Sequence, residues 1–169
     1  MLHTSRGQRL GHAGWKALHP GGRVGLARAV KYLLDTHIWH RAIDDAKRAQ
    51  EPLSPAVLRL IKDEPEQLAV CDISLLELAR HLADSGNPES VCAAIITHGS
   101  APLRVLPISP AIAVRSYALD WPKKGGSAQH RDPADRLIVA TAMLHGLVLV
   151  TEDGEMHHRA PHWHLPVLK

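Results

Sequence analysis

Short apolar runs alternate with segments of helical spacing from about residue 31 to the end of the chain. Strands that are apolar throughout and are separated by helices are typical of a parallel sheet covered on both faces. The pattern therefore predicts an α/β fold with a central parallel sheet of about five strands. The expected strands are Tyr32–Leu34, Leu68–Cys71, Leu103–Ile108, Leu147–Val150 and a short fifth run at Leu165–Leu168.

Capping signals and apolar spacing predict the helices between these strands. Ser54-Pro55, Ser109-Pro110 and Asp132-Pro133 each place an N-cap residue before a proline, and Gly146 is a natural helix end. Residues 120–131 are basic and rich in glycine, which predicts a loop. The expected helices run from about Trp39 to Arg48, from Ser54 through Ile61, from Ser74 to Leu82, from Glu89 to Thr97, from Ser109 to Leu119 and from Asp132 to His145.

Composition fits one globular domain. The chain has 169 residues, of which 45% are hydrophobic and 22% charged. The longest apolar stretch, around Leu137–Leu144, is too short to cross a bilayer, so we expect no membrane association. Only two cysteines are present, Cys71 and Cys92, both in apolar surroundings. This count excludes a disulfide scaffold and a cysteine-based zinc site, and it favours a reducing, cytoplasmic location.

The basic character of the chain belongs to its first 30 residues. Residues 1–30 carry five Lys and Arg and no acid, so all 17 Asp and Glu lie after them. Three interpretations stay open: a disordered arm that contacts nucleic acid, an organelle transit peptide, for which Ser and Thr are too few, or a segment upstream of the true translation start. We therefore expect a basic extension at 1–30 and a folded domain at 31–169.

Acidic residues stand where the predicted strands end. Ligands of open α/β sheets bind beyond the carboxyl ends of the strands. Carboxylates gathered there would repel one another, and a hard divalent cation such as Mg²⁺ or Mn²⁺ relieves that repulsion. The pattern thus predicts a metal site that activates water against a phosphodiester. The acids are Asp35, Asp72, Glu77, Asp132, Asp135, Glu152 and Asp153.

Each acid also has a purely structural interpretation. Ser74-x-x-Glu77 has the spacing of a capping box, in which Glu77 satisfies a backbone N–H. Asp132 and Asp135 suit the first turn of a helix, because its dipole favours negative charge there. Asp153-Gly154 is a turn signal. Taken together, these interpretations do not explain why so many strand ends carry an acid.

Four motifs contain most of these acids: Leu33–Trp39, Ile73–Ala79, His130–Ala140 and Leu149–Asp153. They resemble those of PIN-domain proteins, and more narrowly those of VapC toxins from bacterial type II toxin–antitoxin pairs. The resemblance covers about residues 31–169, with the motifs in the family's order. It implies a PIN-like three-layer α/β/α domain.

The resemblance also implies an activity, that of an endoribonuclease dependent on Mg²⁺ or Mn²⁺. It implies RNA as substrate, a VapB-type antitoxin as partner, and usually a homodimer. Thr151 and Ser74 are expected beside the acids as hydroxyl residues. The acids carried over as catalytic and metal-binding residues are Asp35, Glu77, Asp135 and Asp153, with Asp132 as an additional metal ligand.

Basic residues near the predicted acidic edge are candidates for RNA contacts. Lys123, Lys124 and Arg131 are placed to steer a phosphate backbone, although the same loop also fits an ordinary solvated turn. Arg80 and Arg136 either bind phosphate or balance the acids. The chain departs from the family pattern by the His40-Arg41 pair after Trp39 and by Asp72.

Other functions remain to be weighed. The main alternative is a non-catalytic PIN-like binding module that acts through an antitoxin complex on operator DNA. A receiver-type phosphoacceptor with Asp35 as acceptor needs a lysine after the last strand, where this chain has Glu152 and Asp153. The histidines near the C-terminus fit no closed zinc pattern. Trp39, Trp121 and Trp163 suit packing better than base stacking.

Overall fold

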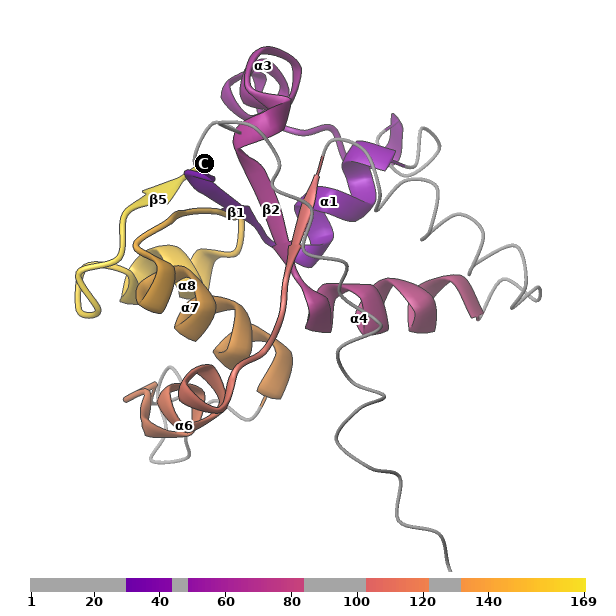
Figure 1. Cartoon of the computed structure of the whole chain (residues 1–169). Helices are drawn as coiled ribbons and strands as arrows, with labels where there is room; N and C mark the ends of the chain where they lie inside the picture. The colour runs from indigo at the N-terminus through magenta and orange to yellow at the C-terminus, as the bar shows by residue number, and fades with distance from the viewer. Residues whose placement is uncertain (1–29, 44–48, 84–102, 122–131) are drawn as a thin grey trace, which may run out of the picture.

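The computed structural model describes residues 30–43, 49–83, 103–121 and 132–169. Its centre is a five-stranded sheet in the order β3-β2-β1-β4-β5, and every neighbouring pair is parallel (Figure 1). The predicted parallel sheet is confirmed, although β3, β4 and β5 are shorter than the apolar runs that contain them. The strands are β1 (Tyr32–Leu34), β2 (Leu68–Cys71), β3 (Arg104–Leu106), β4 (Val148–Val150) and β5 (Val167–Leu168).

Helices connect the strands, and three of them begin at the caps that the sequence predicts. Ser54, Ser109 and Asp132 each accept a hydrogen bond from a backbone N–H in the first turn of the following helix. Gly146 ends a helix with φ at 64°, the left-handed conformation that glycine adopts without strain. The helices are α1 (Thr36–Ile43), α3 (Pro55–Asp63), α4 (Asp72–Ala83), α6 (Pro110–Ala118), α7 (Pro133–His145) and α8 (Gly154–Arg159), with a short 3₁₀ helix η2 (Pro65–Gln67).

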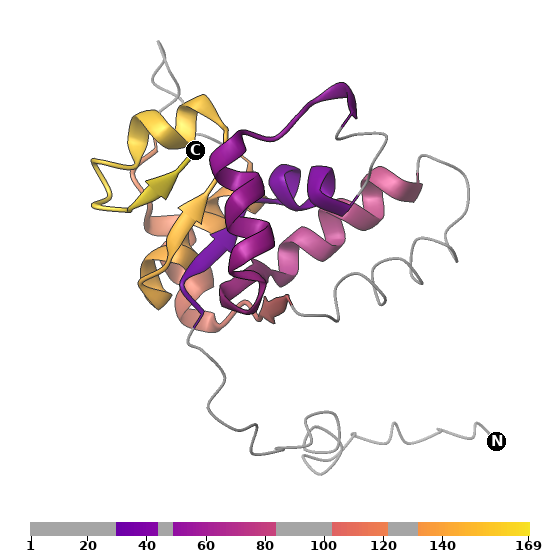
Figure 2. The ribbon, with the colours of Figure 1, turned by 90° about the horizontal axis from the view of Figure 1, so that it is seen from above.

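The helices form a layer on each face of the sheet. Because side chains alternate along a strand, Leu33 and Leu34 of β1 point to opposite faces. Leu33 joins a core with α6, α7 and α8, whereas Leu34 joins a core with α1, α3 and α4. Figures 1 and 2 show these two sets of helices on either side of the strands. The three-layer α/β/α architecture is therefore confirmed.

Two helices begin earlier than expected. Helix α1 begins at Thr36, directly after β1, and not at Trp39, whose N–H already donates to the carbonyl of Asp35. Helix α4 begins at Asp72, directly after β2. Ser74 therefore lies inside the first turn of α4, and the interpretation of Ser74-x-x-Glu77 as a capping box is wrong.

A helix replaces the turn expected at Asp153-Gly154. The Asp153 carboxylate accepts from the N–H of Met156 at 2.9 Å and caps helix α8. The sequence did not predict α8, since of its six residues only Met156 is buried. The predicted helix Glu89–Thr97 and the second cysteine, Cys92, lie outside the described residues.

The tryptophans pack in the core, as expected. Trp39, Trp121 and Trp163 are all buried, and the rings of Trp121 and Trp163 meet edge to face with centroids 4.7 Å apart. The indole N–H of Trp163 donates to the carbonyl of Asp120. None of the helices in the described residues has both the length and the apolar character needed to cross a membrane.

Candidate functional site

Strand register places Asp35 beside the end of a neighbouring strand. Leu34 of β1 pairs with Val150 of β4, so the next residues, Asp35 and Thr151, emerge side by side at the carboxyl edge. Thr151 Oγ1 donates to Asp35 Oδ2 at 2.6 Å. The N–H of Asp35 also donates to the carbonyl of Val150. Asp35 is only 3% exposed, so its carboxylate is held at the base of the site by its neighbours.

A hydroxyl pair holds Glu77 close to Asp35. Thr36 Oγ1 lies 2.5 Å from Glu77 Oε2 and 2.8 Å from Ser74 Oγ, which is fully buried. Thr36 has one hydroxyl proton, which the carboxylate attracts more strongly, so the hydroxyl of Ser74 donates to Thr36 in turn. Burial raises the pKa of Glu77, and the negative charges of Asp132 and Asp35 add to this effect. Glu77 therefore lies in a negative environment that a cation would relieve.

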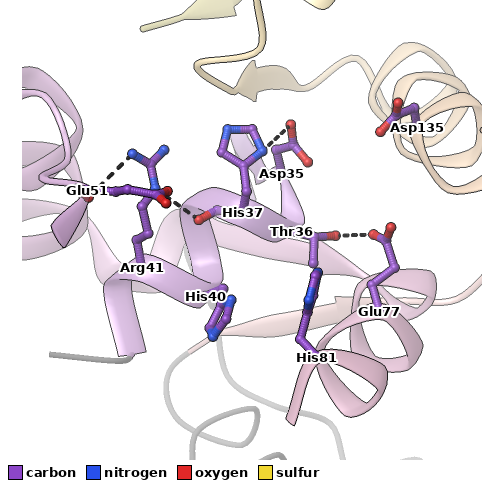
Figure 3. A pocket seen from close by; sticks show the side chains of 9 residues that line it. All are labelled: Asp35, Thr36, His37, His40, Arg41, Glu51, Glu77, His81 and Asp135. Atoms are coloured by element: carbon purple, nitrogen blue, oxygen red, sulfur yellow. Dashed lines mark hydrogen bonds and ion pairs between the residues drawn. The ribbon is translucent and has the colours of Figure 1, made fainter. Parts of the chain in front are cut away.

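Asp135 joins Asp35 and Glu77 in lining one pocket, whose fourth acid, Glu51, lies beside Arg41. Asp135 lies in the first turn of α7, whose Ile138 and Val139 pack on the sheet. Figure 3 shows Asp35, Glu77 and Asp135 reaching from β1, α4 and α7 toward a common space. The pocket has a volume of about 300 Å³. Asp35, Glu77 and Asp135, which lie far apart in the sequence, thus meet at one edge of the sheet.

Imidazole and guanidinium groups form the other side of this pocket. His37 Nδ1 lies 3.1 Å from Asp35 Oδ2, and His37 Nε2 accepts from the backbone N–H of Glu152. Burial lowers the pKa of His37, but the hydrogen bond and negative charge of Asp35 outweigh it, so the net shift is upward. His40, Arg41 and His81 also line the pocket (Figure 3).

The remaining predicted ligands lie at the periphery of the pocket. Asp132 and Asp153 are exposed, do not line the pocket, and use a carboxylate oxygen to cap α7 and α8. Both act electrostatically within reach of the site: Asp132 raises the pKa of Glu77, and Asp153 contributes to the raised pKa of His37. The structure therefore brings three of the five predicted ligands together and places two at the rim.

Two further acids of the strand ends have structural partners. Asp72 Oδ2 accepts from the N–H of Ile108 at 3.1 Å and ties β2 to the segment after β3. Glu152 pairs with buried Arg41 at 2.8 Å and accepts from the N–H of Ser54. These contacts give Asp72 and Arg41, two of the departures noted in the sequence, partners within the fold.

Comparison with known proteins identifies the fold family. The model of the PIN domain family matches residues 32–161. The chain belongs to the PIN-domain family. Ribonuclease VapC22 of Mycobacterium tuberculosis is 33% identical to it over 132 residues, which cover 76% of this chain and 92% of that relative.

Solved structures show the same PIN fold. VapBC2 from Rickettsia felis, solved with a DNA fragment from its promoter, superposes with a TM-score of 0.61 at 18% identity, over 82% of this chain and 98% of that chain. DNA-bound VapBC from Salmonella typhimurium gives a TM-score of 0.55 at 19% identity, over 82% of this chain and 97% of that chain. At sequence identities this low, the likeness shows a shared fold and nothing further.

The PIN-domain pocket has suitable donor chemistry for a hard divalent cation. Within the described ranges, no three His, Cys, Asp or Glu side chains already form a ready set of metal ligands. Mg²⁺ does not require such a set, because it keeps several waters and binds through one or two carboxylates. Asp35, Glu77 and Asp135 would supply those carboxylates. Burial is the main cause of the raised pKa of Glu77, and the negative charges of Asp132 and Asp35, which a cation would offset, add to it.

Sequence reasoning missed several residues of this pocket. Thr36 follows Asp35 directly, and His81 lies four residues after Glu77, a spacing that places both on one face of a helix. These spacings in the sequence could have indicated that Thr36 and His81 lie beside the acids of the pocket. The predicted RNA contacts Lys123, Lys124 and Arg131 lie outside the described residues.

Arg136 has a role that the sequence did not suggest. It is buried, and its guanidinium donates to the backbone carbonyls of Ser116, Tyr117 and Leu119 at the end of α6. Neither phosphate binding nor charge balance describes these contacts. Arg136 instead fastens α7 to the C-terminal end of α6.

Proposed function

We propose that this chain is a metal-dependent endoribonuclease of the VapC type, the toxin of a toxin–antitoxin pair. The observation that carries the proposal is the meeting of Asp35, Glu77 and Asp135 at one pocket on the carboxyl edge of the sheet. The 33% identity to a ribonuclease over most of both chains supports the reaction class. A domain that only binds other molecules would not need three carboxylates that repel one another in one pocket.

In this proposal Mg²⁺ or Mn²⁺ is held by Asp35, Glu77 and Asp135. Two further carboxylates, those of Asp132 and Asp153, reach the ion through a water molecule or by rotating away from the helix N-termini that they cap. When bound, such an ion acidifies water and offsets negative charge at the scissile phosphorus. The hydroxyl of Thr151 holds Asp35 in place by a hydrogen bond of 2.6 Å. The pair Ser74 and Thr36 orients Glu77 in the same manner.

The substrate and partners follow from the same family. We assign RNA as substrate, with products that carry 5′-phosphate and 3′-hydroxyl ends, and a VapB-type antitoxin that covers the acidic pocket. VapBC complexes among the proteins of the same fold support that partner. We also assign a homodimer and a cytoplasmic location, which suits the free thiol of buried Cys71.

Cleavage of total RNA tests the proposed activity. The purified protein should cut RNA in Mg²⁺ or Mn²⁺, and EDTA should stop the reaction. Asp35→Asn and Asp135→Asn should each lower cleavage by at least about a hundredfold, as removal of a charge that stabilises the transition state does. The matched control is Asp63→Asn, which neutralises an exposed acid at the end of α3.

Two outcomes would overturn the assignment. Cleavage that persists in EDTA or in both Asp→Asn variants places the chemistry elsewhere. Absence of cleavage together with tight, metal-independent binding to operator DNA in an antitoxin complex favours the binding module. Circular dichroism of each variant confirms that it is folded, and co-purification with the product of an adjacent small reading frame tests the antitoxin.

A further inference from the structure

One peptide group at the carboxyl end of β4 lies between two imidazole rings. The N–H of Glu152 donates to Nε2 of His37 at 3.4 Å, and the carbonyl oxygen of Thr151 lies 2.8 Å from Nε2 of His157. This N–H and this carbonyl belong to the same peptide unit, the one that joins Thr151 to Glu152. His37 comes from α1 and His157 from α8, so two helices that are distant in the sequence hold this peptide.

The peptide determines which nitrogen of each neutral ring carries the proton. A backbone N–H can only donate, so Nε2 of His37 accepts and the proton of that ring lies on Nδ1. A carbonyl oxygen can only accept, so Nε2 of His157 donates. The two histidines therefore have opposite tautomers, Nδ1–H in His37 and Nε2–H in His157.

The Nδ1–H of His37 is directed at the most buried acid of the pocket. Nδ1 lies 3.1 Å from Asp35 Oδ2, the same oxygen that accepts from Thr151 Oγ1 at 2.6 Å. Figure 3 shows the ring of His37 beside this carboxylate. Two donors on one oxygen fix the rotation of the carboxylate, and with it the direction in which the second oxygen, Oδ1, is presented to a cation.

We propose that His37 is a positioning residue for Asp35 and that the Thr151–Glu152 peptide selects the tautomer with which it does so. The inference rests on the proposed ribonuclease function and adds a residue to its site. Both ring nitrogens of His37 are engaged, so in this arrangement the ring neither binds the ion nor exchanges a proton with the substrate. It acts through Asp35, and the chain of hydrogen bonds from His157 through the peptide to Asp35 polarises each of its members.

The tautomers can be measured in the metal-free protein. Two-bond proton–nitrogen correlation spectra of isotope-labelled protein separate a protonated ring nitrogen from an unprotonated one, and substitution of each histidine in turn assigns its signals. Burial lowers the pKa of His37, but the hydrogen bond and charge of Asp35 raise it more, so the spectra are recorded at about pH 9, where the ring is neutral. We expect Nδ1–H in His37 and Nε2–H in His157. Any other state of either ring overturns the inference.

Two amide substitutions separate the roles of the two nitrogens of His37. Asparagine places an amide N–H near the position of Nδ1, whereas glutamine carries its amide out to the position of Nε2. The side chain of His37 is 42% exposed, so neither change opens a cavity in the core. His37→Gln and His37→Phe should weaken binding of Mn²⁺ about tenfold, as loss of a group that orients a metal ligand does. His37→Asn should keep most of the wild-type affinity. Calorimetry with Mn²⁺ alone measures these affinities.

Cleavage kinetics should follow the same order. The substrate is a short RNA that spans the strongest cut made by the wild-type protein in total RNA. In His37→Gln and His37→Phe kcat should fall about tenfold with KM changed much less, because a misplaced acid affects the reaction and not the binding of RNA. In His37→Asn kcat should stay near that of the wild type.

His158→Phe is the matched control, since it removes the exposed imidazole next to His157 in α8, and it should behave as wild type. Equal losses in His37→Asn and His37→Gln, or no loss in either, overturn the inference. A wild-type protein that neither binds Mn²⁺ nor cuts RNA overturns the proposed function as well. Binding and cleavage that ignore the His37 substitutions overturn the positioning role alone.

Discussion

The hydroxyl of Thr151 joins Asp35 to Asp153. It donates to Asp35 Oδ2 at 2.6 Å and accepts from the backbone N–H of Asp153 at 3.1 Å. Thr151 is fully buried, so no water competes for either bond. One side chain therefore sets both the rotamer of the central acid and the path of the chain into α8.

Thr151→Val should impair cleavage more than stability. Loss of the hydroxyl removes the shorter of the two contacts to Asp35 Oδ2 and leaves only His37 Nδ1 at 3.1 Å, which costs about 1–2 kcal/mol of unfolding free energy. Misplacement of the acid should lower kcat by about tenfold to a hundredfold. Urea unfolding and RNA cleavage measure the two effects. Thr141→Val, at a buried threonine of α7, is the matched control and should lose stability but not kcat. A normal kcat in Thr151→Val would contradict the positioning role.

Glu77→Gln should stabilise the metal-free protein while abolishing cleavage. Burial and the charges of Asp132 and Asp35 raise the pKa of Glu77 in the folded state. The folded state therefore loses stability as pH rises through that pKa, and a neutral glutamine avoids the loss. In EDTA at pH 7 the variant should have a higher free energy of unfolding than the wild type. This difference in unfolding free energy should disappear below the ordinary pKa of a glutamate. Glu66→Gln, on an exposed residue, should show no such difference. A lower stability of Glu77→Gln at pH 7 would refute the argument.

The Arg41–Glu152 pair should make stability depend on acid pH. Burial raises the pKa of Glu152, but the N–H of Ser54 and the guanidinium of Arg41 outweigh it, so the net shift is downward. Its contribution is complete above the ordinary glutamate pKa and is lost as pH falls through the lowered one. Glu152→Gln should cost about 3 kcal/mol at pH 7, because Arg41 is left as a buried unpaired charge.

Urea unfolding at a series of pH values measures this deficit, which should disappear at acid pH. Glu66→Gln serves again as the exposed control. A deficit that is the same at all pH values would mean that the glutamine shape, and not the charge, is responsible.

Arg136→Lys should weaken the fold without affecting RNA. Lysine cannot reproduce the planar fork that donates to three carbonyls, so about 2 kcal/mol of unfolding free energy should be lost. Thermal or urea unfolding gives the stability, and KM for RNA gives the binding. Arg115→Lys, on the exposed face of α6, should leave both unchanged. A raised KM with unaltered stability would restore the phosphate-binding interpretation.

Much of the fold was predictable because its signals are local. Buried strands are apolar throughout, and Ser54, Ser109 and Asp132 cap their helices with their own side chains. Helices α1 and α4 were placed too late because they follow their strands without a loop, so no cap precedes them. Helix α8 was missed because a single buried residue, Met156, gives no periodicity.

The site was predictable only in part. The rule that ligands bind at carboxyl ends of strands indicates a set of acids that includes Asp35, Glu77 and Asp135, and the family motifs separate these three from Asp72 and Glu152. The meeting of His40 with His81 depends on how α1 packs against α4, which no local pattern encodes. The capping contacts of Asp132 and Asp153 likewise depend on where α7 and α8 begin.

Strand order has a consequence for the newly made chain. β1 lies between β2 and β4 in the sheet. Asp35, at the end of β1, is made before its hydrogen-bond partner Thr151, which follows 116 residues further on. A nascent polypeptide that stops before β4 exposes the edge of its central strand and lacks the Thr151 donor for that acid. Competence for chemistry therefore waits for the synthesis of β4 and Thr151, 116 residues after Asp35.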